Sequence, residues 1–325
     1  MKALALFSGG LDSTLAIKLI QDQRIEVIAL NFTSPFCTCI GKGCSIINLA
    51  NNLGVKIKTI HKGLDYLRII KNPKHGYGKN LNPCIDCRIY ILKKAKNYAR
   101  KIDAKFIFTG EVLGQRPMSQ HRQALKLIEK EAGLKNKILR PLSAKYLPET
   151  EAEKNCWVNR EKLLAITGKG RSPQINLAKK YQIEGIMCGG KGCRLTDREF
   201  CIKLKDLFKN KKRISMKDIS LLKCGKHFRF ENNKIIVGRN KEDNNFLLKN
   251  KGLLFETKDI AGPVTLLLGK PNKKSIEIAA KLTARYSDSN REKVLINYGK
   301  KQILVEKFKD QEIEEFRLKK PTPKN

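Results

Sequence analysis

Acidic residues, histidine and tryptophan are scarce in this sequence, and long apolar runs are missing. One tryptophan and four histidines stand among 325 residues, and no apolar stretch approaches the length that spans a bilayer. Met1–Phe7 passes directly into a strand-like run, without a basic segment or a cleavage site for secretion. We therefore expect a cytoplasmic location and no membrane partner.

The shortage of acidic residues leaves a formal net charge of +36, from 67 Lys and Arg against 31 Asp and Glu. From Cys224 onward the chain has 23 basic and 13 acidic residues, so both parts of the chain are basic. An excess of this size repels itself unless a polyanion offsets it. It favours a nucleic-acid partner over a surface that is merely rich in lysine.

The ten cysteines also constrain the function. A chain without a secretion signal does not normally build a disulfide framework. Cys37 and Cys39 form one close pair, and Cys84 and Cys87 form another. These spacings indicate metal, cluster or sulfur chemistry.

Short apolar runs alternate with helical patterns over the first 145 residues. Strands separated by helices predict a doubly wound parallel sheet of the α/β class, covered on both faces. The predicted strands are Ala3–Phe7, Glu26–Phe32, Val55–Ile60, Lys105–Thr109 and Ile138–Leu142. The predicted helices are Thr14–Gln21, Ser45–Leu53, Ile85–Lys101 and Ser119–Ala132, and Pro148–Tyr181 is expected to be mostly helical.

A smaller C-terminal α+β domain is predicted to begin near Cys224, with a hairpin around Glu231–Asn233. Further strands and the amphipathic helix Ser275–Tyr286 give it enough residues for its own core. The predicted boundaries are an α/β domain at 1–205 with its core at 1–145 and an extension at 146–205, a basic linker at 206–223, the second domain at 224–312 and a charged tail at 313–325.

The most informative motif lies between the first predicted strand and the first predicted helix. It consists of Ser8, Gly9, Gly10, Leu11, Asp12 and Ser13. Two glycines let the backbone turn tightly against a phosphate, and the helix that follows offers free N–H groups to an anion. Asp12 is expected to orient the loop or to lie near a metal bound to the phosphates. An ordinary capped turn is the alternative.

This hexapeptide resembles the PP-loop, Ser-Gly-Gly-x-Asp-Ser, of the ATP pyrophosphatases. The resemblance implies a Rossmann-like domain that splits ATP into AMP and pyrophosphate with Mg²⁺ on the phosphates. It implies ATP contacts along Ser8–Ser13 and a catalytic role for Asp12. Asn31 and Phe32, at the end of the second predicted strand, and Arg88 are further candidates for the nucleotide site.

A second motif runs from Thr109 to Gln115 and is followed by Ser119 and Gln120. It begins where a predicted strand ends, which is the edge at which such sheets bind ligands. The segment resembles the Thr-Gly-Glu-x-Leu-Gly-Gln…Ser-Gln stretch of tRNA 4-thiouridine synthases of the ThiI type. The resemblance implies that Gly110 and Gln120 help to hold ATP.

Cys84 and Cys87 open a predicted helix at a spacing suited to a metal, a cluster or a redox pair. The pair resembles the Cys-x-x-Cys of cluster-dependent tRNA thiolases, which hold a 4Fe-4S cluster by three cysteines. Cys193 lies in a segment similar to Gly-Gly-Cys-Leu-Leu-Thr-Asp of ThiI-like proteins, so it is the third candidate ligand, with Cys188 as the alternative. Two buried thiols and a surface thiol are the other interpretation.

A further group, Cys37, Cys39 and Cys44, follows the second predicted strand. This loop is suited to a second metal or to a persulfide relay, and a tight turn with incidental thiols is an equal alternative. Zinc would need a fourth ligand that the neighbouring sequence does not supply.

The C-terminal domain resembles the NFACT-R RNA-binding domain. The resemblance rests on Lys226–Phe228, on Ile236–Asn240 with Asn244 and Asn245, and on Asp259–Pro263. It implies that this domain holds RNA through its backbone phosphates, which position a nucleic acid without specifying its sequence.

Together these resemblances predict ATP-dependent thiolation of tRNA, with 4-thiouridine as the expected product. Asp12, Cys84, Cys87 and Cys193 are the predicted catalytic residues. Sulfide or a persulfide-carrying protein is the expected sulfur donor, and a persulfide on the same cysteines would replace the cluster. The alternatives are 2-thiouridine at the wobble position, an RNA-binding adaptor, and an ATP pyrophosphatase that acts on a small molecule.

Overall fold

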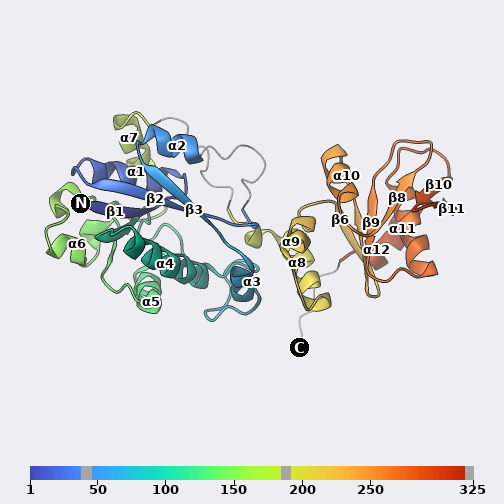
Figure 1. Cartoon of the computed structure of the whole chain (residues 1–325), viewed down its shortest axis with the longest axis horizontal. Helices are drawn as coiled ribbons and strands as arrows, with labels where there is room; N and C mark the ends of the chain where they lie inside the picture. The colour runs from blue at the N-terminus through green and yellow to red at the C-terminus, as the bar shows by residue number, and fades with distance from the viewer. Residues whose placement is uncertain (38–45, 184–191, 319–325) are drawn as a thin grey trace. The chain divides into compact units, whose positions relative to one another are not determined.

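The computed structural model describes residues 1–37, 46–183 and 192–318. The chain forms two compact units, Met1–Asp197 and Arg198–Asn325 (Figure 1). Cys39, Cys44 and Cys188 lie outside the described residues. In the described ranges, every helix is too short or too polar to cross a membrane.

The first unit is built on a five-stranded sheet with the strand order β3-β2-β1-β4-β5. Every neighbouring pair is parallel, so each strand returns to the sheet through a crossover. This is the doubly wound α/β sheet that the sequence predicts. Its strands are β1 (Lys2–Leu6), β2 (Glu26–Thr33), β3 (Lys56–His61), β4 (Phe106–Thr109) and β5 (Ile138–Leu139).

Helices cover both faces of this sheet (Figure 1). The helices α1 (Leu11–Gln21) and α2 (Ile46–Asn52) pack on one face, and α4 (Cys84–Lys101) and α5 (Arg122–Ala132) pack on the other. The remaining elements of this unit are α3 (Leu64–Lys71), η1 (Ala144–Tyr146), α6 (Glu151–Lys154), η2 (Arg160–Lys162), α7 (Ser172–Lys180) and η3 (Arg194–Thr196).

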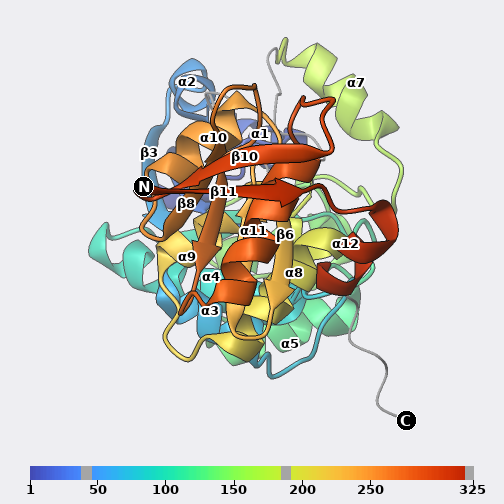
Figure 2. The same ribbon diagram turned by 90° about the vertical axis from the view of Figure 1, so that its right-hand side faces the viewer.

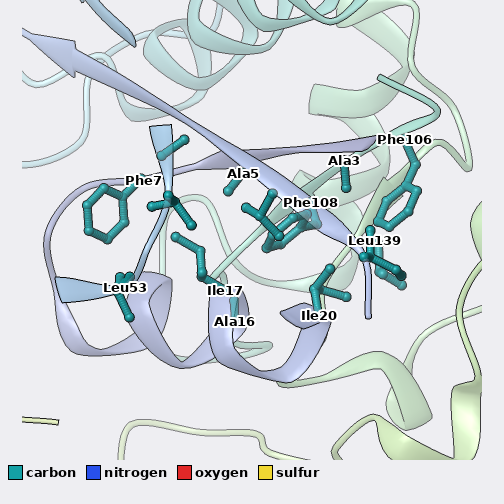
Figure 3. Packing of buried hydrophobic residues seen from close by; sticks show 14 of the residues in the cluster. Ala3, Ala5, Phe7, Ala16, Ile17, Ile20, Leu53, Phe106, Phe108 and Leu139 are labelled. Atoms are coloured by element: carbon teal, nitrogen blue, oxygen red, sulfur yellow. The ribbon is translucent and has the colours of Figure 1, made fainter. Parts of the chain in front are cut away.

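The central strand β1 is buried on both sides. Ala3, Ala5 and Phe7 pack into the core formed with α1 (Figure 3), whereas Leu4 and Leu6 pack into the core formed with α4 and α5. A strand that is covered on both faces needs a continuous apolar run, which explains the sequence Ala3–Phe7. The loop that follows β1 is therefore anchored by two packed layers.

Some predictions in this unit are wrong in detail. The strand predicted at Ile138–Leu142 ends at Leu139, because Arg140 turns into buried ion pairs and Pro141 has no N–H for a strand ladder. The region 148–181 is less helical than expected. Gly168 adopts a positive φ of 87°, and helix α7 begins only after this glycine-containing stretch. The helix α3 was not anticipated.

The second unit is an α+β fold around a six-stranded sheet with the strand order β11-β10-β8-β9-β7-β6. All of its neighbouring strands are antiparallel. The strands are β6 (Lys226–Phe230), β7 (Asn233–Val237), β8 (Leu253–Thr257), β9 (Thr265–Leu268), β10 (Lys293–Tyr298) and β11 (Lys301–Glu306). The helices are α8 (Arg198–Asn210), α9 (Met216–Leu221), α10 (Lys241–Leu248), α11 (Lys273–Arg285) and α12 (Asp310–Phe316).

The two faces of this sheet are covered differently. The long helix α11 packs on one face of the sheet (Figure 2). Its residues Ala279 and Ala280 lie in a cluster with apolar residues from most of the strands. On the other face, Ile236 and Leu266 form a smaller apolar cluster with residues of α9 and α10. Alternate residues of β7 therefore serve two separate cores.

The observed boundaries differ from those that the sequence suggests. The first unit ends at Asp197 rather than at 205, and α8 begins the second unit. The expected linker 206–223 contains the end of α8 and all of α9. The expected tail 313–325 begins inside α12, because Ile313 is fully buried in a stretch that reads as charged.

Candidate active site

The loop between β1 and α1 forms a compact turn at the carboxyl end of the central strand. Gly9 has a φ of 72°, a left-handed conformation that suits glycine. The Ser13 hydroxyl donates to the Gly10 carbonyl at 2.8 Å and lies 3.2 Å from the Ser8 hydroxyl. Because α1 begins at Leu11, its free N–H groups point into this loop. The turn has the features of an anion site.

Asp12 in the first turn of α1 keeps one oxygen available. Its Oδ2 accepts a hydrogen bond from Gln115 Nε2 at 3.1 Å. Its Oδ1 is buried and has no partner within the described residues. A carboxylate oxygen held in this way fits a hard cation such as Mg²⁺. Gln115 was not selected from the sequence, although it belongs to the motif that begins at Thr109.

The other predicted nucleotide residues occupy different positions around the loop. Asn31 is buried and donates to the Phe7 carbonyl at 2.9 Å, so it ties β2 to the end of β1. Phe32 is partly buried and packs against the core on the α4 side. Gln120 is buried, and its Oε1 has no partner among the described residues. Gly110 lies against the backbone of the loop itself.

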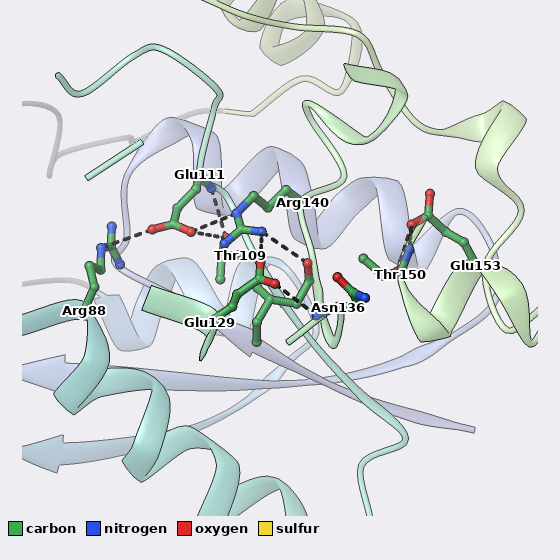
Figure 4. A network of polar contacts seen from close by, with 9 residues as sticks. Arg88, Thr109, Glu111, Glu129, Asn136, Arg140, Thr150 and Glu153 are labelled. Carbon is green, nitrogen blue, oxygen red and sulfur yellow. Dashed lines mark hydrogen bonds and ion pairs between the residues drawn. The ribbon is translucent and has the colours of Figure 1, made fainter. Parts of the chain in front are cut away.

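A buried ionic network is centred on Glu111 and Arg140 (Figure 4). Glu111 accepts from Arg88 Nε at 3.2 Å and from Arg140 Nε at 3.1 Å. Arg140 also donates to Glu129 at 2.5 Å. Burial opposes ionisation of Glu111, but the two guanidinium groups outweigh it and lower the pKa of this carboxyl. The network fixes the orientation of Arg88, one of the predicted nucleotide residues.

Arg116 is a residue that the sequence interpretation missed. Although much of its side chain is exposed, desolvation of the guanidinium lowers the pKa of Arg116, and the charge of Arg88 lowers it further. Cys84 and Asp12 act in the opposite direction. Arg116 thus lies within electrostatic range of the phosphate loop and of the first thiol. Its place directly after Gln115 was the only signal in the sequence.

The three selected thiols come together near this point. Burial raises the pKa of Cys84, the charge of Cys87 raises it further, and Arg116 and Arg88 oppose both effects. Burial also raises the pKa of Cys193 to about 11, with further contributions from Cys87 and Cys84. Cys193 is far from the other two in sequence, so the fold brings the three thiols within mutual electrostatic range.

Lys62 contacts the thiol group directly. Its side chain is buried, its Nζ donates to Cys87 Sγ at 3.2 Å, and it lies 4.6 Å from the centre of the Tyr66 ring. Burial and the neighbouring thiols raise the pKa of Tyr66, so this phenol stays neutral. Lys62 follows the last strand residue of β3, at the carboxyl edge where ligands bind in such sheets.

Cys37 lies beside Cys193. The two residues are directly opposed in an isolated antiparallel bridge, and the Arg194 N–H donates to the Phe36 carbonyl at 2.9 Å. One member of the Cys37, Cys39 and Cys44 group is therefore at the thiol site. Cys39 and Cys44 lie outside the described residues.

Cys84, Cys87 and Cys193 are the candidate ligands for the predicted 4Fe-4S cluster. Such a cluster needs thiolates that close on one point. The donor chemistry of Cys84, Cys87 and Cys193 fits, and the three thiols lie within mutual electrostatic range. However, no three His, Cys, Asp or Glu side chains in the described ranges are already placed to hold a metal ion.

Two family models match separate parts of the chain. Residues 1–146 match the model described as thiamine biosynthesis protein (ThiI). Residues 225–317 match the model described as NFACT protein RNA binding domain. The first unit thus carries a ThiI-like domain and the second an NFACT-type domain, as the sequence motifs indicate. The helices α8 and α9 lie outside both matched ranges.

Two curated relatives resemble part of this chain over part of their own length. An uncharacterized protein of Methanocaldococcus jannaschii is 27% identical over 122 residues, which cover 38% of this chain and 45% of that protein. A probable tRNA sulfurtransferase of Thermococcus kodakarensis is 28% identical over 123 residues, which cover 35% of this chain and 30% of that protein. The chain therefore spans less than half of either relative.

Among solved structures, the chain resembles a 4-thiouridine synthetase in complex with RNA and ATP. The sequence identity is 23% and the TM-score is 0.34. The similarity covers 55% of this chain and 50% of that one.

Proposed function

We propose that this chain, in which a ThiI-like domain precedes an NFACT-type RNA-binding domain, is an ATP-dependent tRNA thiolase that forms 4-thiouridine. The observation that carries the proposal is the position of Arg116. Its guanidinium lies within electrostatic range of Asp12 of the phosphate loop and of Cys84. This position supports the proposal that the groups that activate a base with ATP and those that deliver sulfur belong to one site.

In the proposed reaction, the loop Ser8–Ser13 and the N-terminus of α1 bind the phosphates of ATP. Arg88 and Arg116 repel each other in the absence of an anion, and a polyphosphate between them would remove that cost. Asp12 would hold Mg²⁺ through its unpartnered oxygen. The uridine carbonyl oxygen then attacks the α-phosphate, and pyrophosphate leaves.

Sulfur delivery is proposed to occur at Cys84, Cys87 and Cys193. In the persulfide route, the terminal sulfur of a cysteine persulfide attacks the activated carbon and AMP leaves. A second thiol then breaks the sulfur–sulfur bond, and the resulting disulfide is reduced by an external thiol. A cluster on the same residues, with Cys188 as the alternative ligand, would instead supply bound sulfide.

Lys62 supports either route because its ammonium stabilises negative charge on the Cys87 sulfur. The NFACT-type domain is proposed to hold the tRNA through phosphate contacts. The target uridine must leave its stack to reach the site.

The test is thiolation of unmodified tRNA with ATP and Mg²⁺, followed by mass spectrometry of the digested nucleosides. It is run with sulfide, which serves the cluster route, and in parallel with a persulfide-carrying donor protein and an external thiol, which serve the persulfide route. The 4-thiouridine product should depend on ATP and appear with equal AMP. Cys84→Ala, Cys87→Ala and Cys193→Ala should each abolish it, while Cys156→Ser, at an exposed cysteine outside the site, should retain it. A 2-thiouridine product would correct the position of the modification, and AMP formation without any thiolated base would refute the proposal.

Iron and sulfide analysis of protein purified without oxygen separates the two sulfur routes. About four irons per chain, lost in each of the three alanine variants, would establish the cluster. Iron-free protein that thiolates tRNA with the persulfide-carrying donor but not with sulfide would establish the persulfide route.

A further inference from the structure

The second unit contains an open groove on the sheet face opposite α11. Its volume is about 850 Å³. It lies between the segment that runs from the end of α8 through α9 and the segment that follows α10. Lys211 and Lys217 line one side, Lys249 and Lys251 line the other, and Arg229 and Lys234 are also in the lining. Against these six basic side chains stands one acidic residue, Asp218.

The least exposed basic groups of the groove, Arg229 and Lys234, share one carboxylate partner. Asp206 of α8 pairs with Arg229 of β6 and accepts from Lys234 of β7 at 3.0 Å. These contacts join α8 to β6 and β7, so the part of the groove wall that α8 provides is attached to the sheet. Figure 2 shows these helices beside the strands of this unit.

Of the four outer lysines, three have no ion-pair partner among the described residues. Lys211 pairs with Asp218 at 2.7 Å. Lys217, Lys249 and Lys251 are exposed, and among the residues that the structure describes none of them forms an ion pair. Three unpaired cations on two sides of one groove repel one another, and an extended polyanion between them would remove that repulsion.

An aromatic ring lies among these lysines. Phe246 of α10 is 37% exposed and lines the same groove. Its exposure costs hydrophobic free energy that burial under a flat partner would recover. Single-stranded nucleic acids bind in basic grooves in which aromatic rings stack on the bases.

We propose that this groove binds a single-stranded segment of RNA, with the backbone phosphates on Lys217, Lys249 and Lys251 and a base stacked on Phe246. The proposal deepens the proposed function and rests on it only in taking RNA as the ligand. It extends the RNA-binding surface to α8 and α9, which lie outside the range matched by the NFACT model. An acidic protein segment would satisfy the lysines but would leave the ring without a stacking partner.

The test uses the full chain and a fluorescein-labelled 12-nucleotide RNA of mixed sequence, with anisotropy measured over a range of salt concentrations. The variant K217A/K249A/K251A should bind about tenfold more weakly, and its slope of log affinity against log salt should fall by about 2. Phe246→Leu keeps the apolar bulk, so it should weaken binding about fivefold with an unchanged slope.

The matched control removes three other exposed lysines of the same unit that lie outside the groove, K258A/K300A/K301A. It should leave affinity and slope close to those of the unaltered chain. Equal losses in the two triple variants would overturn the proposal, because net charge alone would then explain the binding. Unchanged binding in the groove variant would also overturn it, while leaving tRNA thiolation standing.

Two further outcomes are decisive. If Phe246→Leu has no effect and heparin competes as well as RNA does, the groove is a general polyanion site and the single-stranded RNA assignment is wrong. If the unaltered chain binds no RNA at all, both this inference and the proposed function fail.

Discussion

Gly110 lies so close to the first turn of α1 that a Cβ atom on it would stand 2.4 Å from the backbone nitrogen of Ser13. The same atom would lie 2.5 Å from the carbonyl carbon and oxygen of Asp12. All three neighbours are backbone atoms, which cannot rotate away. The end of β4 can approach the phosphate loop this closely only because residue 110 has no side chain. This explains why the motif has glycine at this position.

Gly110→Ala should therefore impair ATP use strongly. The overlap must push the Asp12–Ser13 peptide away from β4, and a small displacement of a catalytic group costs on the order of a hundredfold in rate. AMP formation from ATP should fall by about that factor. Gly170→Ala is the matched control, because a Cβ at Gly170 meets nothing within 4 Å. Equal activity of the two variants would show that the contact is unimportant.

Glu111→Gln should destabilise the first unit. The substitution keeps the shape of the side chain but leaves Arg88 and Arg140 without their shared charge, and breaking a buried ion pair costs about 3–5 kcal/mol. Trp157, which packs against the core of this unit, reports its unfolding by fluorescence. In contrast, Glu161→Gln breaks an exposed pair with Lys145 and should cost about 1 kcal/mol or less.

The same carboxyl predicts how stability depends on acid. The folded-state pKa of Glu111 is lowered from 4.5, so its contribution is fully present above pH 4.5 and is lost as the pH falls through the folded value. The Glu111→Gln variant should lack this part of the acid sensitivity. Parallel curves of unfolding free energy against pH for the two proteins would contradict the assignment.

Lys62→Met should slow the reaction of the Cys87 thiol with an alkylating reagent without unfolding the protein. Methionine fills a similar volume beside Tyr66, but it removes a charge-assisted hydrogen bond to the sulfur, which is worth about a tenfold change in reactivity or more. Alkylation of Cys87 by iodoacetamide at pH 7.5, followed by peptide mass spectrometry, gives the rate. Lys58→Met changes an exposed lysine on β3 and should leave the rate unaltered. The prediction fails if both variants alkylate alike.

His227→Gln should make the second unit less sensitive to mild acid. Burial lowers the pKa of His227 well below 6.5, and Lys234 and Lys203 add to this shift. Below pH 6.5, His227 is protonated in the unfolded chain but stays neutral in the folded chain. The free energy of unfolding therefore falls by up to about 1.4 kcal/mol for each pH unit. Calorimetry at pH 7.5 and 5.5 should show a smaller loss in the variant. The exposed His61→Gln should behave as the unaltered chain does.

The sheet of the first unit could be predicted because its signals are local. Each buried strand reads as an apolar run, and each helix between strands has its own periodicity. The strand predicted at Ile138–Leu142 was too long because the ion pairs of Arg140 join residues distant in the sequence. Similarly, the burial of Ile313 depends on the strands against which α12 packs, so the charged residues around it misled the sequence interpretation.

The candidate site was only partly visible in the sequence for the same reason. Phosphate loops and cysteine pairs are contiguous motifs, whereas Lys62 and Arg116 matter through neighbours that only the fold supplies. The position of Lys62 just after a strand of a parallel sheet was a usable signal. Nothing in the sequence indicates that Cys37 stands opposite Cys193.

That last pairing has a consequence for how the protein is made. The Arg194 N–H donates to the Phe36 carbonyl, and these two residues are separated in sequence by most of the first unit. Cys193 likewise joins thiols that are synthesised much earlier. Long-range contacts of this kind form late, after the local elements have closed. During synthesis, the phosphate loop can therefore fold before the group of sulfur-carrying residues is complete. The emerging unit stays chemically incomplete until its last segment docks.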